Sequence, residues 1–229
     1  MPSGFTSIAT LLKTNDPGLH FEMKQTNDEF QVTAVHSKSQ NPVNVSSSIA
    51  FVYGSRASTD EAYFAWQGEK LYELPVAWLH PQNEWATGAF DTSGVGNHAR
   101  ELKPRCFECH NTYLEHVSGT VNQYNPNAIL LGVTREVCHG PGKEHVELNQ
   151  SQQPPDDQAI VRPGEMVRQQ LLDLCGQCHS NAIRSKRESM SYRPGEPIEE
   201  HFKVLETQYP EQDRVANQMK YMKESKCFT

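Results

Sequence analysis

Two copies of one five-residue motif constrain this chain more than any other feature of its 229 residues. Residues 106–110 read C-F-E-C-H and residues 175–179 read C-G-Q-C-H, so each is a complete C-x-x-C-H. The chain holds six cysteines, and none of them lies in the first 105 residues. A disulfide framework usually spreads its cysteines more evenly over a smaller chain, so this clustering favours a bound group instead.

The spacing within the motif suits covalent attachment of haem. Two thiols three positions apart on one helical turn can each add to a vinyl group, and the histidine that follows can then ligate the iron. The predicted attachment residues for two haem c groups are Cys106, Cys109, His110, Cys175, Cys178 and His179. A zinc site or a thiol-exchange site is the alternative, because both use the same cysteine spacing.

A third element, residues 135–139, keeps only part of the motif. It reads R-E-V-C-H, so Cys138 and His139 are present while Arg135 stands where the first cysteine would be. Cys138 can still form one thioether, with His139 as the iron ligand of a third haem. Alternatively the haem has been lost and Arg135 fills its space, or Cys138 is a buried thiol beside a hydrogen-bonded imidazole.

Charge and hydropathy exclude two classes of protein. The chain has 21 lysines and arginines against 28 aspartates and glutamates, a net charge of −7, whereas a nucleic-acid-binding protein needs a basic patch. It contains no run of 18 apolar residues, so no transmembrane segment is expected. The first residues also lack the basic and apolar regions of a signal peptide. Because bacteria attach haem covalently outside the cytoplasmic membrane, we expect a periplasmic or otherwise exported protein, with a leader missing from this numbering.

The hydropathy pattern predicts a mixed α+β fold in two parts. Residues 1–85 form the β-rich part, because alternating apolar positions over 21–35 and again over 62–74 each surround a turn-rich stretch, as in a hairpin. A short apolar strand is expected over residues 49–53. Residues 86–229 form the haem-binding part, with short helices and long loops.

Three more detailed expectations concern the second part and its start. The regular periods fade beyond Pro75, and residues 86–155, rich in Gly, Asn and Pro, are expected to form loops and short helices. One helix is predicted to begin at Pro163 and to carry Cys175 near its end. Another is predicted over residues 213–226, where apolar residues recur at helical spacing.

From about Val52 to Phe228 the sequence resembles a family of bacterial multihaem c-type cytochromes, often linked to tetratricopeptide repeats. The matching stretches include both complete motifs, C-H-G-P-G-K-E-H-V at residues 138–146 and S-Y-R-P-G-E-P at residues 191–197. The family pattern has cysteine where Arg135 stands and usually histidine where this chain has Val215. Family members also tend to carry further C-x-x-C-H motifs on both sides of this segment, so the chain looks like a fragment or a reduced member.

The resemblance also bears on the second axial ligand of each haem. His145, six residues after His139, is the first candidate, and the resemblance implies that it ligates a neighbouring haem. The alternative is a surface histidine on a short helix. His116 is the second candidate, and His80 and His98 are further ones. Three histidines are expected to be ordinary exposed or half-buried side chains: His20, His36 and His201.

These observations favour an electron-transfer protein over an enzyme. The expected function is periplasmic electron transfer by a multihaem module that exchanges electrons with redox partner proteins or other haem domains. One alternative is a redox enzyme of oxyanions or nitrogen compounds, in which one haem keeps an open coordination site. The other is an interaction module that has lost its haems, for which Arg135 and Val215 are the best support.

Overall fold

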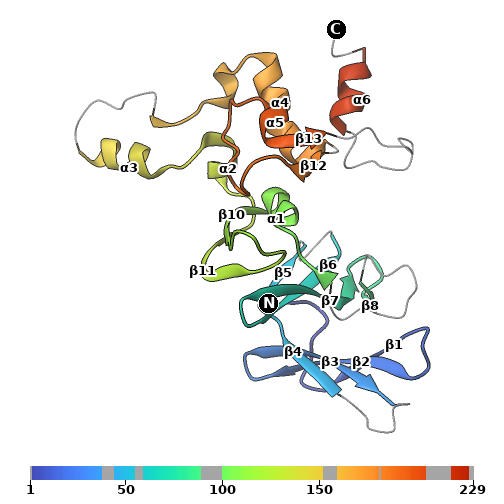
Figure 1. Ribbon diagram of the computed structural model, residues 1–229. Coiled ribbons are helices and arrows are strands. Elements are labelled where there is room, and N and C mark those ends of the chain that lie inside the picture. Colours follow the sequence, from blue (N-terminus) through green and yellow to red (C-terminus); the bar gives the residue numbers. More distant parts are fainter. Residues whose placement is uncertain are drawn as a thin grey trace. The chain divides into compact units, whose positions relative to one another are not determined.

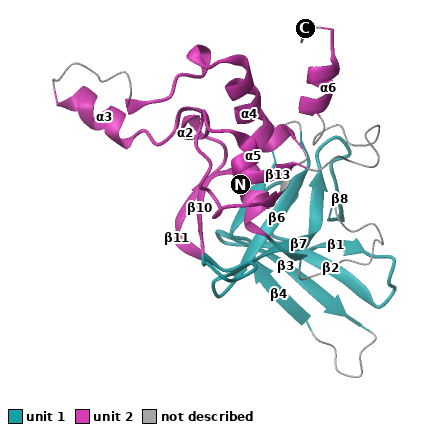
Figure 2. Ribbon diagram, turned by 45° about the horizontal axis from the view of Figure 1, so that its top comes forward, with its two compact units in different colours: residues 1–102, 117–124 teal, residues 103–116, 125–229 magenta. Residues whose placement is uncertain are grey.

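The computed structural model describes residues 2–37, 44–54, 59–88, 100–151, 159–180, 182–204 and 218–226. Its strands and helices confirm the expected α+β class, and Figure 1 follows them along the chain. The chain divides into two compact units, which Figure 2 colours separately. Unit 1 comprises residues 1–102 and 117–124, and unit 2 comprises residues 103–116 and 125–229.

Unit 1 contains two antiparallel sheets. The first has the order β1-β2-β3-β4, with bounds Thr10–Lys13, Leu19–Thr26, Glu29–His36 and Asn44–Ser48. The second has the order β5-β6-β7-β8, with bounds Phe51–Tyr53, Glu61–Gln67, Lys70–Leu79 and Glu84–Thr87. A short strand, β9 (Arg100–Glu101), also pairs with β7.

Both predicted hairpins are confirmed. β2 pairs with β3 from Leu19↔His36 to Thr26↔Glu29, and β6 pairs with β7 up to Gln67↔Lys70. The second turn needs a left-handed residue and has Gly68 there, at φ +62°. The predicted strand over residues 49–53 is two residues shorter, because β5 begins at Phe51.

The expectation that regular structure fades beyond Pro75 is wrong. β7 continues through Pro75 to Leu79 and pairs with β8 from Val76↔Thr87 to Leu79↔Glu84. Proline lacks the N–H that a central strand donates, so it usually interrupts a ladder. Here the register between β6 and β7 shifts opposite Tyr63, and Pro75 lies in that irregular stretch, where the ladder does not require its N–H.

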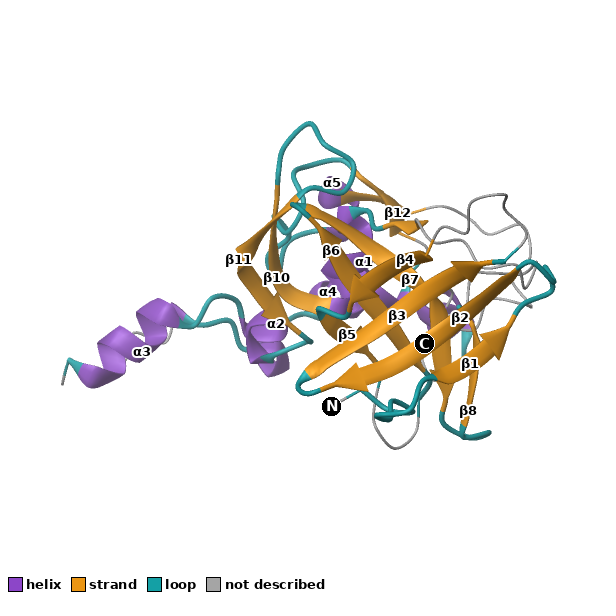
Figure 3. Ribbon diagram, turned by 90° about the horizontal axis from the view of Figure 1, so that it is seen from below, coloured by secondary structure: helices purple, strands orange, loops and turns teal. Residues whose placement is uncertain are grey.

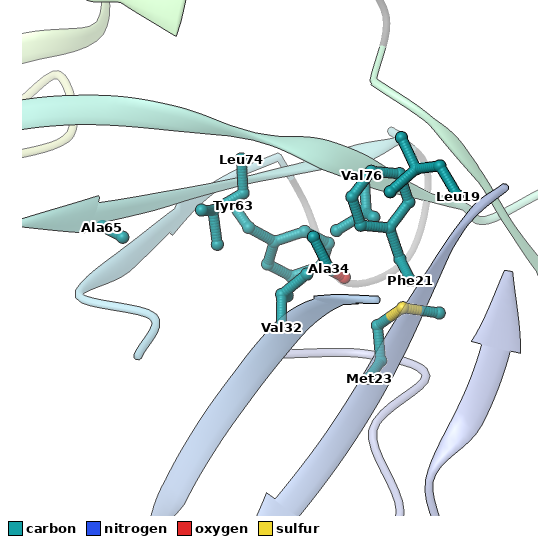
Figure 4. Packing of buried hydrophobic residues seen from close by; sticks show 9 residues of the cluster. All are labelled: Leu19, Phe21, Met23, Val32, Ala34, Tyr63, Ala65, Leu74 and Val76. Atoms are coloured by element: carbon teal, nitrogen blue, oxygen red, sulfur yellow. The ribbon is translucent and has the colours of Figure 1, made fainter. Parts of the chain in front are cut away.

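The core of unit 1 is formed by side chains from both of its sheets (Figure 4). Its buried cluster takes alternate positions from four strands, as expected when one face of each strand is buried. The members are Leu19, Phe21, Met23, Val32, Ala34, Tyr63, Ala65, Leu74 and Val76. Each large side chain that is fully buried in this way contributes about 1.5–3 kcal/mol.

A buried carboxylate anchors the N-terminal segment of unit 1. Glu61, 2% exposed, accepts hydrogen bonds from the main-chain amide and the hydroxyl of Ser3, both at 2.8 Å, and from Tyr63 Oη at 2.9 Å. His80 Nε2 lies 3.2 Å from the same carboxylate. Gly4 adopts φ +74°, and a Cβ there would lie 2.3 Å from Trp78, so glycine is required for this approach.

Among its described residues, unit 2 has short helices and two pairs of strands, and Figure 3 distinguishes helices from strands by colour. Its helices are α1 (Pro104–His110), α2 (Arg135–His139), α3 (Lys143–Gln150), α4 (Arg168–His179), α5 (Ile198–His201) and α6 (Gln218–Glu224). Its strands are β10 (Asn111–His116), β11 (Tyr124–Leu131, whose first residue belongs to unit 1), β12 (Ala182–Ser185) and β13 (Phe202–Val204). β10 pairs with β11, and β12 with β13.

Two expectations for this unit need correction, and a third is tested only in part. The predicted loops over residues 86–155 do contain short helices, but they also contain the β10–β11 hairpin. The helix predicted from Pro163 is broken into a 3₁₀ turn over Pro163–Glu165 and α4, which starts at Arg168 because the Gln170 side chain caps the amide of Val167. α6 covers residues 218–224, and residues 213–217 lie outside the described residues.

Among the described residues, unit 2 exposes more large hydrophobic side chains than unit 1. One of its buried clusters has four members, Leu174, Tyr192, Ile198 and Phe202, packed with Met166. The large hydrophobic side chains that it exposes are Tyr113, Leu130, Leu131, Val133, Val146, Val167, Leu171, Val204, Tyr221 and Met222. Helix α3 buries none of its residues and projects from the rest of the unit in Figures 1 and 3. An apolar group that fits against these surfaces would therefore stabilise unit 2.

Candidate haem-attachment site

The first complete motif forms the last five residues of α1. Pro104 occupies the first helical turn, where its missing N–H costs nothing, and the helix ends at His110 because Asn111 is extended. Phe107 is fully buried and Glu108 is 2% exposed. Cys106 and Cys109 are half-buried, so both thiols lie at the surface of the helix and remain reachable.

The second motif repeats this arrangement at the end of α4. His179 is the last helical residue, and Ser180 is extended. The two residues between the cysteines are again buried, Cys175 is exposed and Cys178 is half-buried. A Cβ on Gly176 would lie 3.1 Å from Ile198 Cδ1, so the small residue allows α5 to pack closely. Both motifs therefore present two cysteines and a terminal histidine in the same local geometry.

The two motif helices contact each other within unit 2. Gln177 Nε2 donates a hydrogen bond to the main-chain carbonyl of Glu108 at 3.1 Å. Arg105 donates to the carbonyl oxygen of Gln177, and Cys109 Sγ lies 3.5 Å from that same oxygen. The structure thus brings together two sequence-predicted sites that are about 70 residues apart in the chain.

This contact also changes the acidity of two thiols. A hydrogen bond with Cys178 lowers the pKa of Cys109 to about 7, against the opposing effect of burial and with help from the positive charge of Arg105. The pKa of Cys178 is raised, mainly by the hydrogen bond to Cys109 and by burial, and the nearby charge of Cys138 raises it further. A lowered pKa places more Cys109 in the thiolate form, which is the reactive form of cysteine.

The incomplete third element forms α2. Arg135 is its first residue and is exposed, Cys138 is exposed, and His139 is its last residue and half-buried. His139 Nδ1 lies 2.9 Å from the main-chain carbonyl of Val161. Because a carbonyl only accepts, Nδ1 must carry the proton, which leaves the lone pair of Nε2 for a metal. This is the usual orientation of a metal-ligating histidine.

A cavity of about 600 Å³ adjoins His139. Its apolar wall comes from Ile160, Val161 and prolines 141 and 194. Lys143 and Arg193 line it with positive charge, and Glu144 and Glu147 line it with negative charge. Lys143 Nζ lies 3.8 Å from the carboxylate of Glu147, and Arg193 donates to two main-chain carbonyls. A flat apolar group with carboxylate substituents fits this mixture of walls.

The candidate second ligands lie in different places. His145 is half-buried in the first turn of α3, with its ring nitrogens 3.4–3.5 Å from the side-chain amide of Asn149. His116 is half-buried at the end of β10. His80 is in unit 1, beside Glu61. His98, together with Val215 and Cys227, lies outside the described residues.

One histidine that the sequence placed near the surface is buried. His201 is 2% exposed, with Nε2 2.9 Å from the Glu196 carboxylate and its ring edge-on to Tyr192. The expectation of an exposed or half-buried His201 is therefore wrong. It ends the short helix α5 and enters the core of unit 2 because its neighbours Ile198 and Phe202 belong to that core.

Sequence reasoning also missed the residues that join the motifs. Arg105 stacks over the Phe202 ring at 4.5 Å and contacts Glu108, in addition to its bond with Gln177. It thus serves packing within unit 2. The amide of Met190, at φ +59°, donates to the Glu108 carboxylate at 3.0 Å. No local pattern signals the contacts of Arg105 with Gln177 and Phe202, because they join distant segments. The same holds for the contact of Met190 with Glu108.

The described residues fit covalent haem. The five described cysteines are free thiols, both complete motifs sit at helix ends with the required spacing, and His139 has the tautomer of a ligand. Over the part of the chain that the structure describes, no three His, Cys, Asp or Glu side chains gather closely enough to hold a metal ion. In the same part, no helix combines the length and the hydropathy needed to cross a membrane.

Comparison with known proteins agrees with the sequence resemblance. Residues 61–140 match the sequence model of the family described as cytochrome c554 and c-prime. The matched range includes the first complete motif and the incomplete third element, and it ends before the second complete motif. No curated protein matches the chain. The family match confirms the resemblance to haem-binding c-type cytochromes.

Two solved structures are similar to parts of the chain. The first is the outer cell wall cytochrome OcwA, with 18% identity and a TM-score of 0.45 over 68% of this chain and 32% of that one. The second is an undecahaem cytochrome from the S-layer of Carboxydothermus ferrireducens, with 20% identity and a TM-score of 0.40 over 60% of this chain and 19% of that one. The chain therefore spans about a third and a fifth of the lengths of these two proteins.

Proposed function

We propose, from the premise that this chain is similar to the multihaem c-type cytochromes, that it is an electron-transfer module with closely spaced haems. The observation that carries the proposal is the contact between α1 and α4, each of which ends in a complete attachment motif. Because the rate of electron transfer falls steeply with distance, a protein that passes electrons between haems must hold them close together. The packing of two attachment helices against each other meets this requirement.

The residues of the two motifs have distinct roles in this proposal. Each pair of cysteines forms two thioethers, and the histidine at the helix end ligates the iron. When bound, haem c supplies a one-electron Fe(II)/Fe(III) couple. The buried middle residues Glu108 and Gln177 hold the two helices in register, and Arg105 adds a contact to the Gln177 carbonyl.

A third attachment site belongs to the same proposal. His139 carries its proton on Nδ1 and is thereby prepared to ligate iron through Nε2, and Cys138 is exposed for one thioether. The adjoining cavity of about 600 Å³ has an apolar wall, and Lys143 lies at its edge as a partner for a propionate. His145 and His116 are the proposed second axial ligands. Both are half-buried, so their rings remain accessible to an iron.

The two parts of the chain would then differ in their role. The β-rich N-terminal part, proposed over residues 1–85, folds around its own aromatic and aliphatic core. The haem-binding part, proposed over residues 86–229, exposes apolar side chains that bound haems would cover. The module would exchange electrons with redox proteins or other haem domains. Its site of action would be the periplasm or another exported location, because haem is attached there.

One observation favours a redox enzyme as the second candidate. A smaller cavity of about 280 Å³ is lined by Asn111, Gln177 and Val137, so residues next to or within all three motifs border it. The side-chain amide nitrogen of Asn111 is buried there, without a hydrogen-bond partner among the residues that the structure describes. Such a cavity beside an open coordination site would suit a small polar ligand. Carbon monoxide binding to the reduced, haem-loaded protein would indicate an open site, whereas an unchanged spectrum favours electron transfer alone.

The proposal is tested by making the chain in a host with a c-type cytochrome maturation system. We expect an intact mass that exceeds the polypeptide mass by two haems, or by three if Cys138 also binds one. Replacing both cysteines of either complete motif with serine should remove one haem each, while Cys227→Ser should remove none. A mature protein with the mass of the polypeptide alone would overturn the proposal. Reductive titration should then show haem absorbance bands that respond to electrons and return on reoxidation.

A further inference from the structure

The thiols of Cys109 and Cys178 lie at the contact between α1 and α4. Cys178 Sγ lies 3.9 Å from the main-chain carbonyl oxygen of Cys109. Cys109 Sγ in turn lies 3.5 Å from the carbonyl oxygen of Gln177, the residue before Cys178. These two contacts place the second cysteine of each motif beside the second cysteine of the other.

The surrounding contacts hold this pair in place. The Gln177 side chain bonds the carbonyl of Glu108, and Arg105 bonds the carbonyl of Gln177, so the chain on both sides of the two thiols is fixed. Glu108 is itself held by the amide of Met190. A disulfide requires its two Cβ atoms at about 3.5–4.5 Å. Each of the two sulfurs already lies within 4 Å of a carbonyl oxygen in the other motif, so the two residues need little movement to reach that separation. Both thiols are half-buried and therefore accessible to a small oxidant.

We propose that Cys109 and Cys178 form a disulfide in the haem-free chain and that this bond blocks haem attachment at both complete motifs. The oxidant is a small or protein disulfide, of the kind present where exported proteins fold. With oxidised glutathione, one cysteine thiolate attacks the glutathione disulfide and forms a mixed disulfide, and one glutathione thiolate leaves and takes a proton. The other cysteine then displaces the second glutathione. In total two cysteine thiols lose two electrons and two protons, and one oxidised glutathione becomes two reduced glutathiones.

The consequence for loading rests on the proposed haem function. Each motif needs its second cysteine for a thioether, so one cross-motif disulfide removes one attachment sulfur from both motifs at once. A disulfide within one motif would leave the other motif competent. Loading of the two sites would therefore be coupled, and a reductant able to open this particular bond would be required before attachment.

The first experiment maps the disulfide in the full chain made without haem maturation. The protein is incubated with oxidised glutathione, its remaining thiols are alkylated, and its proteolytic peptides are analysed by mass spectrometry. We expect the peptides of Cys109 and Cys178 to be cross-linked. Cys109→Ser should abolish the cross-link, whereas Cys106→Ser and Cys138→Ser should retain it. Predominant cross-links within the motifs, or from Cys178 to Cys138, would overturn the proposal.

The same oxidation in concentrated urea controls for folding. In the unfolded chain the pairs separated by two residues are much closer in sequence than Cys109 and Cys178, so pairing within the motifs should prevail. An identical disulfide pattern in urea and in buffer would mean that the α1–α4 contact does not select the pair, and would count against the proposal.

The second experiment measures loading. The oxidised and the reduced chains are incubated with reduced haem at matched concentrations, under conditions that do not cleave the protein disulfide, and covalent haem is read by staining on a denaturing gel. Loading of the reduced chain alone, with recovery after dithiothreitol treatment of the oxidised chain, supports the block. Equal loading of both forms would overturn it. If the disulfide forms but neither form binds haem, the proposed haem function fails while the assignment of the disulfide is retained.

Discussion

The side-chain amide of Gln177 donates a hydrogen bond of 3.1 Å to the main-chain carbonyl oxygen of Glu108. Each of these residues is the third of its own C-x-x-C-H motif, and both are buried. The bond therefore joins the middle of one attachment motif to the middle of the other. It is one of the direct links between two sites that are separate in the sequence.

Removing this link should destabilise unit 2. Gln177→Ala would leave the buried carbonyl of Glu108 without its partner, at a cost of about 1–3 kcal/mol in the free energy of unfolding. Urea denaturation of the matured protein, followed by circular dichroism, measures the loss. The matched control is Gln150→Ala at the exposed end of α3, which should change the stability by less than about 0.5 kcal/mol. Equal losses in both variants would contradict the role of the Gln177 bond.

His145→Ala tests the second ligand. Gly140, at φ +78°, turns the chain between α2 and α3. We therefore expect His145 to be available to another haem rather than to the one that His139 would hold. We expect the variant to keep all thioethers, to change the spin state of one haem and to raise its reduction potential, because a lost nitrogen ligand stabilises Fe(III) less.

Electron paramagnetic resonance measures the spin state of the haems, and a redox titration measures their reduction potentials. His20→Ala, a partly exposed histidine of unit 1 beside Glu22, is the control and should leave both signals as in the parent protein. Unchanged signals in His145→Ala would mean that His145 is not the second axial ligand. The same two measurements on His116→Ala would then test whether His116 is that ligand.

Arg135→Cys should complete the third motif. Arg135 precedes Cys138 by one helical turn in α2, the same spacing as in the two complete motifs, and its side chain is exposed. The new thiol should form a second thioether at His139, so the matured variant should carry three haems. The pyridine haemochrome spectrum, which differs between one and two saturated vinyl groups, distinguishes a site with one thioether from a site with two. Arg135→Ser removes the same arginine without adding sulfur, and a gain in this variant would contradict the interpretation.

Glu61 should make unit 1 sensitive to acid. Burial raises its pKa, but hydrogen bonds from Ser3, Tyr63 and His80 outweigh that effect and the net pKa is lowered. A folded-state pKa below the unfolded value of about 4.3 means that ionised Glu61 stabilises the fold above that pH, and that this contribution is lost as the pH falls through the folded pKa. Glu61→Gln should cost about 1–3 kcal/mol at pH 7, and the difference from the parent protein should shrink below pH 4.

Tryptophan fluorescence is the appropriate signal for this experiment, because all three tryptophans, at positions 66, 78 and 85, lie in unit 1. Urea denaturation of the haem-free chain at several pH values gives the stability of that unit. Glu84→Gln, at an exposed position of β8, should follow the parent protein at every pH. A difference between Glu61→Gln and the parent that does not vary with pH would refute the assignment.

Limited proteolysis should separate the two units. Unit 1 has a nine-residue buried cluster between residues of two sheets, whereas unit 2 exposes ten large hydrophobic side chains among its described residues. In the haem-free chain we expect a resistant fragment from the β-rich N-terminal part and rapid cleavage after it. Haem attachment should protect the second part, because binding is coupled to folding. Uniform resistance of the haem-free chain would contradict this expectation, and the matured protein is the comparison in the same experiment.

Local patterns predicted the local structure well. The hairpins β2–β3 and β6–β7 depend on alternation and on turn residues within about 15 positions, and both are present. The β10–β11 hairpin was not predicted, because its strands lack a clear alternation of apolar and polar residues. The continuation of β7 beyond Pro75 was also not predicted, because a register shift against β6 removes the penalty that proline normally carries in a strand.

The chemistry of the attachment motifs was determined by the sequence itself, because two thiols and a histidine within five residues meet on one helical turn whatever surrounds them. Which motifs lie together was decided only by the tertiary structure. The contacts of Gln177 with Glu108 and of Cys178 with Cys109 join residues about 70 positions apart, and the burial of His201 depends on the core formed by Tyr192 and Phe202. Such pairings result from the packing of whole helices, and no short stretch of sequence contains the information that selects them.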